Sequence, residues 1–305
     1  MVTGAELERA VAAIEPGGRL VEVRELTGGV SATVLALDVE SPSGSTRRVV
    51  FRQHGGREFK GEASEAAIKE HGLLAALHRL GHAVPAPHHL DASGATTDPY
   101  LVVEWIDGST EVSADDLPDA LDQMARFLVG LHRVDAGSVR VPGLTEVEDP
   151  TDAIVPFVPP TAAGESIRAV LAGRPPTGNP GRSVLHGDYW PGNVMWRDGR
   201  LVAVIDWEDA AIGDPMADLA TARVELLCGY GADAMERFTA RYLELATEDD
   251  TAPVTTDLPL WEAYASASAL ATMAAWGLAP SEERHRRHLT QGVLDRAADE
   301  LSAAG

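Results

Sequence analysis

The sequence predicts an α+β fold in which a β-rich N-terminal part is followed by a larger, mostly helical part that contains one β-hairpin. Three observations support this fold class. In the first third of the chain, short apolar runs are separated by turns rich in Gly, Ser and Pro. Beyond Gly108, apolar residues recur with the 3.6-residue period of a helix. Within that helical part, Asp198-Gly199 stands between two apolar runs, which is a strong hairpin signal.

The N-terminal part is expected to hold strands and one helix. Apolar or β-branched runs predict strands at 19–26, 32–39, 48–52, 88–90 and 100–106. The segment 62–80 has apolar residues at helical spacing, and Gly81 follows it as a stop signal. The run 100–106 is typical of a buried strand and ends at Asp107-Gly108.

The remainder of the chain is expected to be mostly helical. A 3.6-residue apolar period predicts a helix at 117–134. Further helices are expected at 215–229, 232–246, 258–276 and 281–303, and a shorter one at 165–171. That shorter helix lies in a loop-rich stretch, since residues 142–182 contain eight of the nineteen prolines. Short strands are predicted at 184–185, 193–197 and 201–205, the last two joined by the Asp-Gly turn. A hinge near 104–110 would separate the two parts, and a cleft between two such lobes is a common ligand site.

Composition excludes several classes of protein. A net charge of −22 argues against a nucleic-acid binder and against a polybasic membrane anchor, both of which are basic. Cys228 is the single cysteine, so we expect neither an internal disulfide nor a cysteine zinc site. A single cysteine also favours a reducing, cytoplasmic location. Acids interrupt the apolar residues of 1–18, which does not fit a signal peptide. The segment 263–279 is rich in Ala, Ser and Thr and favours a buried helix over a membrane span.

One set of residues has the chemistry of a magnesium site. Asp188 and Asn193 lie on one irregular loop between two predicted strands, and Asp206 ends the second strand of the hairpin that follows. Two carboxylates and an amide oxygen are hard ligands, which suit Mg²⁺ better than zinc or copper. Because Mg²⁺ usually completes its coordination shell with substrate phosphates, a nucleotide is the natural partner.

The same residues carry a family resemblance. His186-Gly-Asp188, with Asn193 five positions after the Asp, resembles the H-x-D-x-x-x-x-N catalytic loop of the protein-kinase-like fold, and Ile205-Asp206-Trp207 stands where kinases have D-F-G. The amino-acid sequences of 186–193 and 205–220 are similar to those of the aminoglycoside phosphotransferase family of small-molecule kinases. The resemblance extends from about 26 to 276 and implies a bilobal protein-kinase-like fold. Its N-lobe would span 1–106 and bind the nucleotide phosphates, and its C-lobe would span 107–305, with the hairpin at the catalytic site.

The resemblance also implies roles for the loop residues. Asp188 would orient, or deprotonate, the attacking hydroxyl, while Asn193 and Asp206 would hold Mg²⁺ against the nucleotide phosphates. In a loose phosphoryl-transfer transition state, positioning matters more than basicity. His186 is expected to orient the loop by bonding to backbone. Asp214 and Asp218 are expected to be structural, as the acidic start of a helix.

In the N-lobe, the segment with Gly28, Gly29 and Ser31 resembles the glycine loop of the family, whose backbone approaches phosphates. Kinase-like folds place a lysine on the third strand, but Lys60 and Lys69 are the only lysines and neither lies in a predicted strand. The matching position holds Arg52, whose guanidinium can grip two phosphate oxygens. The helix carboxylate that pairs with Arg52 would be Glu70, and Glu65 and Glu62 are alternatives at helical spacing from it.

The predicted hinge would read the base of the nucleotide through its backbone. By resemblance, the Glu104 carbonyl and the Ile106 amide would bond the adenine edge, with ATP and GTP both left open as phosphoryl donors. The acceptor would be a hydroxyl-bearing small molecule. Residues 108–305 carry 32 acidic and 15 basic side chains, a balance that would favour a cationic acceptor such as an amino sugar. We favour the alternative that these acids cover a solvated surface, because charge counts do not say where the side chains point.

Position in the family plan offers five further acceptor-site residues: Glu208, Asp209, Trp261, Glu262 and Tyr264. Two rival functions remain open. Arg52 in place of lysine would fit a nucleotide-binding module of the same fold with little kinase activity. The second rival is a metal-dependent hydrolase that would use Asp188, His186 and Asp206. The oligomeric state is left open.

Overall fold

The computed structural model describes residues 2–26, 32–54, 63–93, 98–147, 154–173, 183–247 and 257–304. The chain divides into two compact units. The first comprises Met1–Ser109, Val139–Leu144 and Val202–Glu208, and the second comprises Thr110–Ser138, Thr145–Leu201 and Asp209–Gly305. The predicted α+β class is confirmed, because the first unit is built on a sheet and the second is mostly helical.

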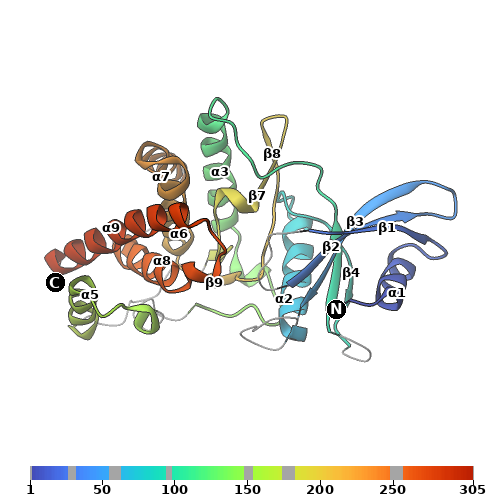
Figure 1. Ribbon diagram of the computed structural model, residues 1–305, viewed down its shortest axis with the longest axis horizontal. Helices are drawn as coiled ribbons and strands as arrows, with labels where there is room; N and C mark the ends of the chain where they lie inside the picture. The colour runs from blue at the N-terminus through green and yellow to red at the C-terminus, as the bar shows by residue number, and fades with distance from the viewer. Residues whose placement is uncertain are drawn as a thin grey trace. The chain divides into compact units, whose positions relative to one another are not determined.

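The first unit is a five-stranded antiparallel sheet flanked by two helices, α1 and α2 (Figure 1). Its strands, in the order β1-β2-β3-β5-β4, are β1 (Arg19–Glu25), β2 (Ala32–Glu40), β3 (Thr46–His54), β4 (Pro87–Asp91) and β5 (Tyr100–Glu104). The helices are α1 (Gly4–Ile14) and α2 (Ala63–Arg79). The five predicted strands and the predicted helix at 62–80 are therefore present, whereas α1 was not expected.

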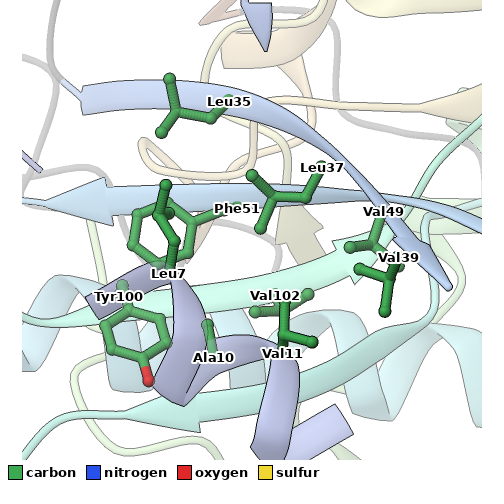
Figure 2. Packing of buried hydrophobic residues seen from close by; sticks show 10 residues of the cluster. All are labelled: Leu7, Ala10, Val11, Leu35, Leu37, Val39, Val49, Phe51, Tyr100 and Val102. Atoms are coloured by element: carbon green, nitrogen blue, oxygen red, sulfur yellow. The ribbon is translucent and has the colours of Figure 1, made fainter. Parts of the chain in front are cut away.

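Helix α1 begins with a cap and covers one face of the sheet. The Glu6 carboxylate accepts hydrogen bonds from the backbone N–H and the hydroxyl of Thr3, at 2.5 and 2.6 Å, and Gln53 of β3 donates to its other oxygen at 3.1 Å. Figure 2 shows the buried cluster that α1 forms with the sheet. Its members are Leu7, Ala10, Val11, Leu35, Leu37, Val39, Val49, Phe51, Tyr100 and Val102.

Strand periodicity fixes where Arg52 points. Successive side chains of a strand face opposite sides of a sheet. Val49 and Phe51 of β3 pack under α1, so Arg52 projects from the other face. That face carries α2, whose Glu70 lies 3.1 Å from the Arg52 guanidinium.

The second unit holds the remaining elements. Its helices are α3 (Leu117–His132), α5 (Ala162–Gly173), α6 (Met216–Tyr230), α7 (Ala232–Thr247), α8 (Leu258–Thr272) and α9 (Pro280–Ala304). Its short strands are β6 (Ser183–Leu185), β7 (Val194–Arg197) and β9 (Ala211–Gly213), and β8 (Arg200–Val204) begins in it. Strand β9, which was not expected, pairs antiparallel with β6, with Val184 opposite Ile212.

The predicted hairpin is confirmed by its turn. Strands β7 and β8 form a two-stranded sheet joined by Asp198-Gly199. The φ angles of these two residues are +51° and +70°, in the left-handed region that a type I′ turn requires at both central positions. An Asp followed by Gly adopts this pair of conformations at low cost.

The apolar helix α8 packs inside the second unit. Leu260, Ala263 and Ala267 lie in a buried cluster with Ile167 of α5 and Leu294 of α9. The prediction of a buried helix at 263–279 is confirmed only for its first part, because α8 ends at Thr272 and most of 271–279 is exposed. Within the described residues, no helix combines the length and the apolar character that crossing a membrane requires.

We expect Phe51→Ala to destabilise the first unit by about 3–5 kcal/mol, because it leaves a cavity beneath α1. It also removes a ring stacked on Tyr100 at a centroid distance of 4.7 Å. Urea denaturation followed by circular dichroism measures the change. Val21→Ala is the matched control, since Val21 on β1 is 48% exposed and its truncation should stay within about 0.5 kcal/mol. Equal effects of the two substitutions would contradict the assignment of this core.

Candidate active site

The residues singled out by the sequence lie in both units. Arg52, Glu70 and Asp206 belong to the first unit, as do Glu104 and Ile106. Asp188 and Asn193 belong to the second unit. Gly28, Gly29 and Ser31, the predicted glycine loop, lie outside the described residues, as does the alternative acid Glu62.

Arg52 is the centre of a buried charge cluster in the first unit. Its Nε lies 3.1 Å from the Glu70 carboxylate, and its Nη2 donates to Asp206 at 2.7 Å and to Glu208 at 2.5 Å. The side chains of Arg52 and Glu70 are 12% and 4% exposed. Burial works against the charge of Arg52, but Glu70, Asp206 and Glu208 outweigh it and raise the pKa of the guanidinium. Arg52 is therefore a fixed cation held by three acids.

Glu70 has two basic partners. Burial alone would raise the pKa of its carboxyl, but Arg52 and the hydrogen bond of His54 hold that pKa below the usual value. The His54 Nε2 lies 3.0 Å from the same carboxylate. Glu65, one of the two alternatives, is exposed on α2. The structure thus brings Glu70 to Arg52, as the sequence analysis expected.

Asp206 sits in a strained turn after β8. Its φ is +67°, a left-handed conformation that is uncommon for a residue with a side chain and that often marks a functional site. The buried Trp207 stabilises the turn by donating its indole N–H to the Val204 carbonyl at 2.9 Å. The turn directs the Asp206 carboxylate to Arg52.

Glu208 is the member of the cluster whose role sequence reasoning missed. The sequence analysis offered it for acceptor binding, whereas in the structure its carboxylate pairs with Arg52. Its backbone carbonyl accepts a hydrogen bond of 2.5 Å from the Lys69 ammonium on α2. Its position two residues after Asp206 was a signal that it lies near the cluster, whereas its pairing with Arg52 depends on the fold.

The loop that follows β6 in the second unit holds Asp188 beside Asn193. The Asn193 amide nitrogen donates to the Asp188 carboxylate at 3.0 Å and to its backbone carbonyl at 2.9 Å. The Asp188 N–H lies 3.2 Å from Nδ1 of the buried His186. His186 therefore orients the loop through backbone, as expected.

Gly187 is required at the sharpest point of this loop. Its φ is +85°, and a Cβ at this position would lie 2.2 Å from the backbone oxygen of Asp209. A side chain does not fit there, which explains the glycine of the His-Gly-Asp sequence.

Asp218 anchors the loop from α6. Its two carboxylate oxygens accept the backbone N–H groups of His186 and Gly187, at 2.7 and 2.8 Å. His132 of α3 contacts the same carboxylate at 3.1 Å, and its other ring nitrogen contacts the Tyr242 hydroxyl at 2.8 Å. Burial would raise the pKa of Asp218, but the hydrogen bond with His132 and the interactions with His186 keep it below the usual value. Asp218 is thus a buried carboxylate, and both of its oxygens have hydrogen-bond partners within the second unit.

Asp214 also has a structural role. It accepts the Met216 N–H at the start of α6 at 2.9 Å, and the Trp261 indole N–H at 3.0 Å. Burial raises the pKa of this carboxyl. Two of the residues offered for acceptor binding therefore have internal partners: Trp261 bonds Asp214, and the buried Glu262 pairs with Arg223 at 2.7 Å.

The predicted hinge residues lie at the end of β5 and directly after it. Glu104 ends β5, and its backbone N–H donates to the Ala86 carbonyl at 2.8 Å. Its carboxylate accepts the Ala86 N–H at 3.1 Å. Ile106 lies two residues farther on and is half-buried.

Comparison with known proteins adds independent information. Residues 22–255 match the family model described as "Phosphotransferase enzyme family" (APH). Among curated proteins, viomycin phosphotransferase of Streptomyces vinaceus is 30% identical over 181 residues, which are 53% of this chain and 61% of that protein. The match thus spans about three fifths of the length of this relative.

Solved structures share the fold. A putative aminoglycoside phosphotransferase from Ralstonia eutropha JMP134 matches with a TM-score of 0.70 and 16% identity, over 97% of each chain. The GDP complex of aminoglycoside 2′-phosphotransferase-IIIa matches with a TM-score of 0.64 and 16% identity, over 97% of this chain and 99% of the other. The predicted protein-kinase-like fold is confirmed by these neighbours. Since the family match covers most of the sequence, the chain belongs to the APH phosphotransferase family.

Proposed function

We propose that the protein is a Mg²⁺-dependent kinase that transfers the γ-phosphate of ATP or GTP to a hydroxyl group of a small molecule. The cluster around Arg52 is the observation that carries this proposal. A guanidinium suited to phosphate oxygens and a carboxylate suited to Mg²⁺ meet there, 2.7 Å apart. Both are needed to bind a metal–nucleotide complex, and the family membership supports phosphoryl transfer as the reaction.

The donor set fits magnesium. By the resemblance, Asp206 would offer a carboxylate and Asn193 an amide oxygen, and both are hard ligands that suit this ion. The Asn193 nitrogen faces Asp188, so the metal ligand would be its oxygen. When bound, Mg²⁺ would neutralise the phosphates and polarise the bond to be broken.

Asp188 would act on the acceptor. Its carboxylate is held by the Asn193 amide, and its backbone is fixed by the Gly187 turn and by His186. A carboxylate fixed in this way can accept the hydrogen of an attacking hydroxyl and align it with the phosphorus. Its contribution would come mainly from orientation, because charge in the transition state resides on the phosphoryl group.

The remaining nucleotide contacts are predictions from the resemblance. Gly28, Gly29 and Ser31 would approach the phosphates, and the backbone of Glu104 and Ile106 would bond the base. A division of labour between residues 1–106 for the nucleotide and 107–305 for catalysis and the acceptor belongs to the same proposal. A related phosphotransferase was solved with GDP, which supports testing guanine as well as adenine nucleotides.

The acceptor that we propose is an aminoglycoside-like compound or another hydroxyl-bearing metabolite. Relatives are named for viomycin and for aminoglycosides. Aminoglycosides are polycations, and the excess of acids in residues 108–305 would attract a cationic molecule. The single cysteine, Cys228, supports a reducing, cytoplasmic site of action.

A nucleotide-binding module with little catalysis is the second candidate. Arg52 replaces the usual lysine, and three carboxylates already occupy its guanidinium. If that cluster resists opening, phosphates would bind without being aligned for transfer. Thermal shifts with ATP or GTP, each with and without Mg²⁺, followed by nucleotide-consumption assays over amino sugars, macrolides and amino alcohols, separate the candidates. Binding without a phosphorylated product from any acceptor would favour the module.

We expect Asp188→Asn and Asp206→Asn to lower kcat by at least about 100-fold, because each removes a carboxylate that the transfer requires. The measurement is phosphorylation of the best acceptor from the panel. Asp38→Asn, which breaks a partly buried pair with Arg48 in the sheet of the first unit, serves as the control and should keep its activity. Wild-type rates in either test variant would refute the assignment of that residue.

Asp218→Asn should separate loop anchoring from nucleotide binding. An amide cannot accept two backbone N–H groups and His132 together, so we expect a loss of roughly 3 kcal/mol of stability. We also expect kcat to fall about tenfold or more while the nucleotide Kd changes little. Asp122→Asn, which breaks a surface pair with Arg126, is the control. An unchanged kcat in a destabilised Asp218→Asn variant would show that this anchor does not position Asp188.

A further inference from the structure

Glu208 connects the two ends of the Arg52 cluster. Its carboxylate accepts from Arg52 Nη2 at 2.5 Å, and its carbonyl accepts from Lys69 at 2.5 Å. Lys69 and Glu70 are consecutive on α2, and Glu70 contacts the Nε side of the same guanidinium. One helix therefore sets the position of both acids that flank Arg52.

The contact of Asp206 with Arg52 involves one oxygen of its carboxylate. In the structure its Oδ1 accepts from Arg52 Nη2 at 2.7 Å. If that oxygen turns to Mg²⁺ in the metal-bound state of the proposed function, Arg52 loses one of the two acids at Nη2. Glu208 is then the acid that stays at this nitrogen.

An arginine needs such a partner more than a lysine does. The ammonium of lysine is a point charge, whereas a guanidinium binds phosphate through a planar fork whose orientation matters. A contact at Nε alone leaves the plane free to tilt, and a second acid at Nη2 fixes it. Because Glu208 is itself held by Lys69, it can fix that plane without rearrangement.

We propose that Glu208 is a positioning residue for the nucleotide: it holds the guanidinium of Arg52 toward the phosphates while Asp206 exchanges Arg52 for Mg²⁺. This inference rests on the proposed function. The opposite role is a competing acid that the phosphates must displace from Arg52. The two differ in sign, because removing a positioning residue weakens nucleotide binding and removing a competitor strengthens it.

Isothermal titration calorimetry of Glu208→Gln with Mg²⁺·ATP and Mg²⁺·GTP tests the sign without any acceptor. We expect Kd to rise about tenfold, the scale of one charge-assisted hydrogen bond. Glu208→Asp, which keeps the charge and shortens the reach, is the second variant should Glu208→Gln not fold, and it should raise Kd at least about threefold. Asp38→Asn removes an equally close acid from Arg48 on the same sheet and should leave Kd unchanged.

A double-mutant cycle shows whether Glu208 acts through Arg52. In an Arg52→Ala background, Glu208→Gln should change Kd less than twofold, since the group to be positioned is gone. An unchanged or lower Kd in Glu208→Gln overturns the inference, and so does a tenfold effect that persists without Arg52. If the wild-type chain binds neither nucleotide with Mg²⁺, the proposed function fails and this inference fails with it. Binding by the wild type that Glu208→Gln retains in full overturns this inference alone.

Discussion

The buried guanidinium of Arg52 is the constraint around which the first unit is organised. An arginine that projects from the middle of a sheet into a covered face must find acids there, because an uncompensated buried charge costs several kcal/mol. Glu70 from α2 meets this need on one side, and Asp206 and Glu208 meet it on the other. This single side chain therefore holds together a strand, a helix and a segment more than 150 positions farther along the chain.

The second unit solves a comparable problem with the opposite charge. Asp218 is a buried carboxylate that two backbone N–H groups and His132 satisfy. The loop after β6 is irregular, and its backbone N–H groups at His186 and Gly187 donate to this side chain. In both units, then, a buried charge fixes the segment that carries the chemistry. The rigidity of the candidate site follows from the cost of leaving either charge unpaired.

Much of this could be predicted from the sequence, and the parts that could not have physical reasons. The Asp198-Gly199 turn and the strand at 48–52 followed from local preferences, which need no tertiary information. Strand β9 is only Ala211–Gly213, which is too short to show an apolar period, and it is defined by its tertiary pairing with β6. The helix at Gly4–Ile14 was missed although Thr3 and Glu6 form a recognisable cap.

The site residues also divide into those that local sequence patterns indicate and those whose contacts depend on the fold. Glu70 could be reached from helical spacing, which left three candidate acids, and only the packing of α2 selects among them. The contact of His132 with Asp218 joins positions 86 apart, and nothing local in the sequence points to it. Glu208 stood in view beside Asp206, but its partner could not be inferred, because the fold and not the spacing brings it to Arg52.

The charge of the cluster resolves an apparent conflict in the composition. A chain with a net charge of −22 is an unexpected host for a polyanionic nucleotide. Around Arg52, three carboxylates face one guanidinium and the nearby Lys69 ammonium, so the cluster itself has no excess of positive charge. A divalent cation would offset part of the charge of these carboxylates, and phosphates that arrive with that cation carry less negative charge than the free nucleotide. On this view the acids around Arg52 do not oppose nucleotide binding; they make it conditional on the metal.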